Sequence, residues 1–154
     1  MQVGPDISVS FAGAQIPASD GSPRAMLDWG RSVGARGVVL DGARAGFRAR
    51  EIGRSARRDL AASMRRREIE IAGIDLWIPA EHFALPEHCG RAVEVVIQTC
   101  VLASELASLV GGRSVGRVSV MTPASIDADV LREMGDGAAM VGAEIVDHRV
   151  GNEG

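Results

Sequence analysis

The feature that most constrains the fold is a repeat in which a helical segment ends near a glycine and passes into a short apolar run. Five runs are expected to be strands, at residues 7–11, 37–41, 73–79, 116–121 and 142–147. They are rich in Val and Ile, and we expect them to be mostly apolar on both faces. This pattern is typical of parallel strands that are buried on both sides and joined by helices. The repeat therefore predicts an α/β fold built from βαβ units.

Four helices are expected between these strands. The first has Ser22 as its N-cap and Pro23 at its first helical position, which are the residues that favour a helix start. The second begins at about residue 55. The fourth begins near residue 127, and we expect it to stop at Met134 because two glycines follow closely.

The third expected helix, residues 87–109, is apolar on two sides, so an element besides the sheet must cover it. Its long apolar stretch contains Glu94, Gln98 and Glu105. Such side chains are costly in hydrocarbon, which favours a core helix over a membrane span.

The size of the chain and its cysteines suggest one domain in a reducing compartment. The 154 residues fit a single domain, residues 1–154. Cys89 and Cys100 fall on one expected helix, about 16 Å apart and beyond disulfide reach. The first residues lack the charged and apolar regions of a signal peptide. These features predict a cytoplasmic protein that is not bound to a membrane.

Arginines gather on the loop that follows the second expected strand. Residues 44–67 hold nine of the 17 arginines and only two acidic residues. That loop lies at the carboxyl edge of the sheet, where parallel α/β folds bind ligands. Arg44, Arg48 and Arg50 could therefore clamp a phosphorylated or carboxylated substrate. The alternative is a solvated basic surface. Nucleic acid is a weaker option, because the net charge is −3 and Phe47 is the only aromatic residue in residues 44–67.

Four further residues at the same edge carry candidate chemistry. Asp41 ends the second expected strand, and His82 follows the third; either could take part in proton transfer. Asp147 and His148 end the fifth strand, and either could bind a divalent metal. Because strand residues alternate between faces, only one of that pair need enter a site.

Taken together, residues 34–41, residues 65–79 and the Asp147–His148 strand end resemble the xylose-isomerase-like TIM-barrel family. The resemblance implies a parallel (β/α) barrel, here about five βα units of an eight-fold barrel. It also implies a sugar or sugar phosphate isomerase or epimerase with a divalent metal (Mn, Mg, Co or Zn). Asp147 or His148 would be a metal ligand. His82 would be the nearest match to the extra histidines of the family's endonuclease branch.

The length leaves three arrangements open, because such a barrel takes about 250 residues. The chain could lack a C-terminal half, or two copies could complete each other as a homo-oligomer. Alternatively, the strands could form a flavodoxin-like doubly wound sheet. The corresponding functions are a metal-dependent isomerase, a non-catalytic half-barrel that self-associates or binds a partner, and an anion-binding domain.

Overall fold

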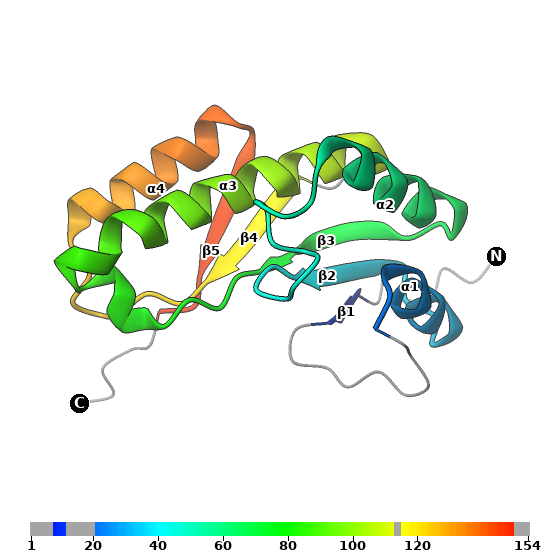
Figure 1. Ribbon diagram of the computed structural model, residues 1–154, viewed down its shortest axis with the longest axis horizontal. Coiled ribbons are helices and arrows are strands. Elements are labelled where there is room, and N and C mark those ends of the chain that lie inside the picture. The colour runs from blue at the N-terminus through cyan, green and yellow to red at the C-terminus, as the bar shows by residue number, and fades with distance from the viewer. Residues whose placement is uncertain (1–7, 12–20, 113–114, 150–154) are drawn as a thin grey trace.

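The computed structural model describes residues 8–11, 21–112 and 115–149, which form a layer of helices on a sheet (Figure 1). The sheet has five strands, all parallel to their neighbours, in the order β1-β2-β3-β4-β5. The strands are β1 (Ser8–Ser10), β2 (Gly37–Asp41), β3 (Glu70–Asp75), β4 (Gly116–Val120) and β5 (Ala143–Asp147). The expected α/β class with a parallel sheet is confirmed.

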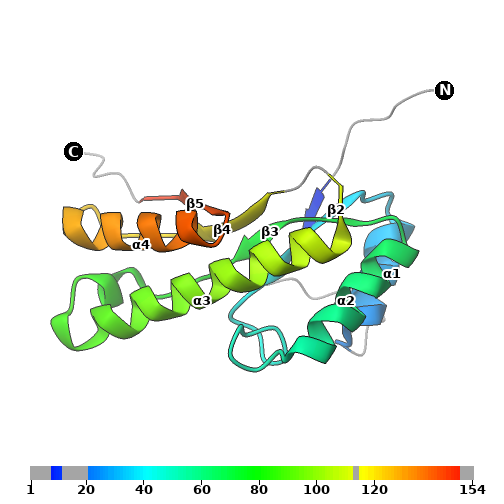
Figure 2. The same ribbon diagram turned by 90° about the horizontal axis from the view of Figure 1, so that it is seen from above.

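The strand order corrects one of the expected alternatives. A flavodoxin-like sheet runs in the order 2-1-3-4-5 and carries helices on both faces, whereas here the order is sequential. Right-handed connections between sequential parallel strands all return on the same side. Figure 2 shows the helices gathered on one side of the sheet. They are α1 (Pro23–Ser32), α2 (Arg54–Arg66), the short 3₁₀ helix η1 (Ala80–Phe83), α3 (Pro86–Val110) and α4 (Ala128–Met140).

The hydrophobic core lies between the sheet and this helical layer. The strand residues that face the helices are buried, including Val38, Leu40, Ile74, Val118 and Val120. Helix α3 lies along β3, β4 and β5 and is flanked by α2 and α4, which supply its expected second cover. By length and composition α3 could cross a membrane. Nine of its residues are nevertheless buried in the core.

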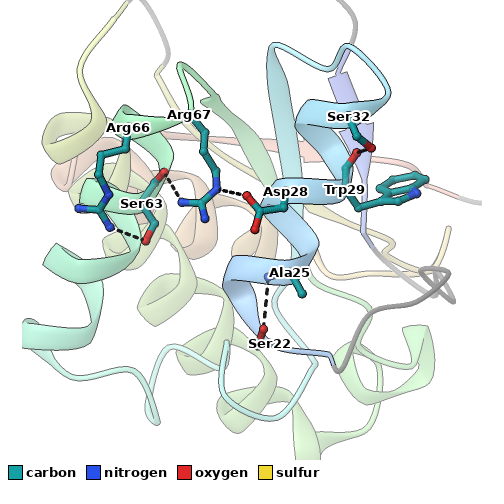
Figure 3. Close-up of polar contacts among 8 residues, drawn as sticks. All are labelled: Ser22, Ala25, Asp28, Trp29, Ser32, Ser63, Arg66 and Arg67. Carbon is teal, nitrogen blue, oxygen red and sulfur yellow. Dashed lines mark hydrogen bonds and ion pairs between the residues drawn. The ribbon is translucent and has the colours of Figure 1, made fainter.

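Helix α1 begins with a side-chain cap and is joined to the end of α2 by an ion pair (Figure 3). Ser22 caps α1 as expected, because its hydroxyl accepts a hydrogen bond from the Ala25 amide at 3.2 Å. At the end of α2, Arg67 Nε lies 2.7 Å from Asp28 Oδ1 of α1. The hydrogen bond from Arg67 lowers the pKa of Asp28 below its ordinary value.

The third strand begins and ends earlier than expected, at Glu70 and Asp75 rather than 73 and 79. It cannot extend to Pro79, because the chain turns where the Ile78 amide donates to the Leu76 carbonyl, and proline has no amide to donate. The shift places Asp75 at the carboxyl end of a strand and moves Trp77 into the connection to η1.

Helix α4 is longer than expected, because it continues through Gly135 and Gly137 to Met140. A Cβ atom added to Gly137 would come within 2.8 Å of two carbons of Ile97 in α3. The glycine therefore allows α4 to approach α3 closely. This close packing offsets the weak helix propensity that suggested an earlier end.

The expectation that both faces of the sheet are apolar and buried is wrong. The face turned away from the helices carries polar side chains, among them Ser8, Ser10, Asp41, Asp75, Arg117, Ser119 and Glu144. We call it the open face. Its members are exposed or half-buried, and Arg117 and Glu144 pair across β4 and β5 at 3.3 Å.

Candidate functional site

Two carboxylates lie side by side where β2 and β3 end. Asp41 and Asp75 are register partners, and partners on neighbouring parallel strands point to the same face about 4.8 Å apart. Ser10 Oγ on β1 donates to Asp75 Oδ2 at 2.9 Å. Asp41 Oδ1 accepts from the Ala43 amide at 3.0 Å. The pair therefore forms one acidic site on the open face.

Strand alternation places both carboxylates on this face. The neighbours of Asp75, Ile74 and Leu76, are buried on the helical side. Gly42 follows Asp41 and packs against the same two residues, since a Cβ there would meet Ile74 at 2.8 Å. Ser119 on β4 is the register partner of Asp75 and extends the polar row. Paired carboxyl groups at such an edge suit general acid and base catalysis.

Asp147 faces the opposite side of the sheet from these carboxylates. Its register partner is the buried Val120. Asp147 accepts hydrogen bonds from the Thr122 amide at 3.2 Å and from the Thr122 hydroxyl at 2.6 Å. Arg149 also lies within 3.3 Å of it. These contacts give Asp147 a structural task in holding the segment that leads to α4.

The two expected histidines each lie beside another ring. His148 follows β5, and its ring centroid is 6.4 Å from that of Trp77. His82 lies in η1, with its ring 4.8 Å from that of His88. No described contact joins either histidine to Asp41. Asp41, His82, Asp147 and His148 all lie at or beyond the carboxyl ends of parallel strands, as expected, but no described side-chain contact joins those of different strands.

The described residues form no ready-made group of ligands for the expected divalent metal. Within the described ranges, no three His, Cys, Asp or Glu side chains come together in a group that could hold one. Asp147 is occupied by Thr122 and Arg149. We therefore derive no chemical step through a metal, and the metal role of Asp147 or His148 stays a prediction.

The arginine loop is braced by its own residues. Arg48 Nε donates to the Ala43 carbonyl at 2.9 Å, and Arg48 Nη1 pairs with Glu51 at 3.1 Å. Glu51 also accepts from the Gly46 amide at 2.9 Å. That backbone hydrogen bond is the main cause that lowers the pKa of Glu51, with smaller contributions from the positive charges of Arg48 and Arg50. Arg48 therefore shapes the loop.

The expected three-arginine clamp is only partly assembled. Arg48 and Arg50 line a pocket of about 240 Å³ between the loop, the end of β3 and α3. Arg44 is not among the residues lining it and lies beside Gly21. The binding role of the three arginines stays a prediction.

The sequence matches no model of a known protein family and no curated protein.

The residues that sequence reasoning missed are Asp75, Ser10, Ser119 and Trp77. The alternation of polar and apolar residues in 116–120 was the available signal for the open face, whereas 143–147 alternates only as far as Ile145. It was outweighed by the overall Val and Ile content of the strands. Asp75 was missed because the strand was expected to run past it to residue 79.

Proposed function

We propose that this chain binds a sugar or sugar phosphate at the carboxyl edge of its open face and transfers a proton on it, as sugar isomerases and epimerases do. The observation that carries the proposal is the side-by-side placement of Asp41 and Asp75 at the ends of adjacent parallel strands. The carboxyl edge is where parallel α/β enzymes place their catalytic groups.

The arrangement of the strands supports the same proposal. Five sequential parallel strands with helices on one side have the layout of the first five units of a (β/α) barrel. We propose on this basis, and on the resemblance of the sequence, a relationship to the xylose-isomerase-like barrels. In such a barrel the open face would be the interior.

The two carboxylates could act as a base and an acid on one ligand. Each has one oxygen that accepts a hydrogen bond from a described residue, Ser10 or Ala43, and a second oxygen that does not. Either carboxylate, when ionised, could take a proton from the carbon beside a carbonyl. The carboxyl group that holds this proton could then return it to the adjacent carbon or oxygen. Hydroxyls at Ser10 and Ser119 would bind sugar hydroxyls.

The test measures proton exchange on a panel of aldoses, ketoses and their phosphates in deuterated water, by NMR. We expect deuterium uptake beside the carbonyl of one ligand. Asp41→Asn and Asp75→Asn should each slow uptake about 100-fold, in line with the usual contribution of general acid–base catalysis. Asn keeps an acceptor oxygen for Ala43 or Ser10, so the loop and strand contacts survive.

Asp136→Asn is the matched control, because Asp136 is an exposed carboxylate on α4, away from the open face. It should leave uptake unchanged. The proposal fails if no ligand in the panel exchanges, or if exchange persists in both open-face variants. Calorimetric titration with Mn²⁺, Mg²⁺, Co²⁺ and Zn²⁺ separately tests the predicted cofactor.

A second candidate, head-to-tail self-association, is favoured by the separation of charge. Residues 21–67 hold twelve arginines and four acidic residues. Residues 68–149 hold five arginines and 13 acidic residues. Figure 1 places α1 and α2 at one end of the molecule and α4 at the other. Opposite charges on two ends favour contact between copies.

Light scattering should then show oligomers at low salt that dissociate at high salt. Arg58→Glu should weaken these oligomers. A monomer at every salt concentration would contradict this candidate.

A further inference from the structure

The pocket beside the arginine loop is lined by the residues that follow Asp41 and Asp75 in the chain, and neither carboxylate lines it. It is enclosed by the loop after β2, the segment after β3 and one side of α3, and it is open to solvent. Its apolar lining includes Ala43, Ala49, Leu76, Ile78 and Val95. A cavity of about 150 Å³ holds benzene, so a pocket of about 240 Å³ has room for one aromatic ring with a short substituent.

Most polar groups in the pocket already have partners. Thr99 Oγ1 donates to the Val95 carbonyl at 2.7 Å, and Gln98 Nε2 donates to Glu94 at 3.1 Å. Arg48 is held by the Ala43 carbonyl and by Glu51. The pocket therefore has few hydrogen-bonding groups left with which to recognise a ligand rich in hydroxyls.

Arg50 differs from these groups. It lines the pocket and makes no hydrogen bond or ion pair with any described residue, although its charge also helps to lower the pKa of Glu51. Glu51, the neighbouring carboxylate, is engaged by Gly46 and Arg48. The guanidinium of Arg50 thus has donors available for a carboxylate, which it can bind through two parallel hydrogen bonds.

Trp77 supplies the flat surface of the pocket. It lines the pocket and is 44% exposed. An aromatic ring of a ligand could pack against the indole in an offset or edge-on arrangement. Trp77 lies two residues beyond the end of β3, and its ring centroid is 6.4 Å from that of His148.

We infer that this pocket binds a small aromatic or branched apolar carboxylate, with the anionic group on Arg50 and the apolar body between Trp77 and α3. A single available cation beside an apolar lining fits a monoanion with an apolar body. A sugar phosphate would leave its hydroxyls unpaired there, which carries a desolvation cost. The inference does not depend on the open-face site.

The test uses phenylacetate and its neutral analogue phenylacetamide, followed by tryptophan fluorescence and by ligand-detected NMR. Phenylacetate should bind saturably and change the emission, and Trp77→Phe should abolish the emission change. Phenylacetamide should bind at least about tenfold more weakly, because it lacks a charge-assisted pair with Arg50. Ribose 5-phosphate should not compete.

Two variants place the ligand in the pocket, and two serve as controls. Arg50→Gln should weaken phenylacetate about tenfold, and Ala49→Phe should block binding by filling the pocket. Arg54→Gln, which changes a nearby exposed arginine that does not line the pocket, should have no effect. Asp75→Asn should also have none, because the Asp75 side chain contacts Ser10 and does not line the pocket, and this separates the site from the proton-transfer site. Equal binding of phenylacetamide, no saturable binding by either method, or unchanged binding in both pocket variants would overturn the inference.

Discussion

The two faces of the sheet are made by the same strands, yet they differ in almost every respect. On the helical side Val38, Leu40 and Ile74 are nearly inaccessible to water. On the open face the residues immediately beside them include Asp41 and Asp75. Because adjacent strand residues alternate, five short segments supply both a dry core and a wet polar surface.

This difference indicates that the helical side of the sheet stabilises the fold, while the open face is available for binding or catalysis. Apolar area removed from water stabilises the fold at about 25 cal/mol per Å², and almost all of that burial occurs on the helical side. The open face contributes little burial, so it can hold like charges that are useful for binding or catalysis. Substitutions on the helical side should therefore lower the free energy of unfolding more than substitutions on the open face.

The largest effect is expected from removing a core side chain. Ile74→Ala should lower the free energy of unfolding by about 3 kcal/mol, through lost burial and a cavity beneath the helices. Ser119→Ala on the open face should change it by less than about 0.5 kcal/mol. Urea unfolding measures both. Comparable losses at the two positions would mean that the open face is packed against something.

A smaller effect should separate two glycines within α4. Gly137→Ala would press a methyl group against Ile97, whereas nothing lies within 4 Å of a Cβ on Gly135. Gly135→Ala should therefore stabilise the protein by up to about 1 kcal/mol through helix propensity. Gly137→Ala should be about 1 to 3 kcal/mol less stable than Gly135→Ala. Thermal unfolding of the two variants side by side measures the difference, and equal stabilities would mean that α3 and α4 are not closely packed.

A still smaller effect, opposite in sign to the core truncation, is expected at the carboxylate pair. Like charges directly opposite each other on adjacent strands are destabilising. Asp41→Asn or Asp75→Asn should raise the free energy of unfolding by about 0.5 kcal/mol at pH 7 while slowing proton exchange about 100-fold. Urea unfolding measures the gain in stability, and the deuterium exchange assay measures the loss of proton exchange. A marked loss of stability would instead make the pair structural.

The smallest effect at neutral pH concerns the two cysteines of α3. Burial raises the pKa of Cys100 to about 11, while Cys89 is only half-buried. Because the thiolate is the reactive form, a thiol reagent at pH 7 should modify Cys89 in the native protein and spare Cys100. The neutral Cys100 thiol stabilises the fold below about pH 9, where the unfolded thiol titrates. That contribution to the free energy of unfolding should be lost as the pH rises towards 11. Rapid labelling of both cysteines in the native protein would contradict the buried position of Cys100.

The sequence was most informative where one local rule decided the outcome. Ser22 and Pro23 placed the start of α1 correctly. The glycine-punctuated runs predicted five parallel strands, and the bounds of β2 were predicted to the residue. Prediction was wrong where a neighbour in space overrode local propensity, as at Gly137, which α4 needs to approach Ile97.

The candidate site was less predictable. Asp41 was expected at the edge, but its partner Asp75 depended on where β3 ends and on its register with β2. The available donors of Arg50 depend on the hydrogen bonds that Arg48 and Glu51 make instead. Such pairings depend on the packed loop, and spacing in the sequence does not fix them.

The sequence by itself determined the alternation of helices and strands, their parallel direction and the crowding of arginines near the second connection. These follow from local propensity and from the connection lengths that parallel strands require. Only the tertiary structure decided the strand order, which side of each strand meets the helices, and that Asp147 turns inward while Asp41 and Asp75 face outward. The physical reason is that one residue of register reverses the direction of every side chain in a strand, and register is settled by packing between elements distant in the sequence.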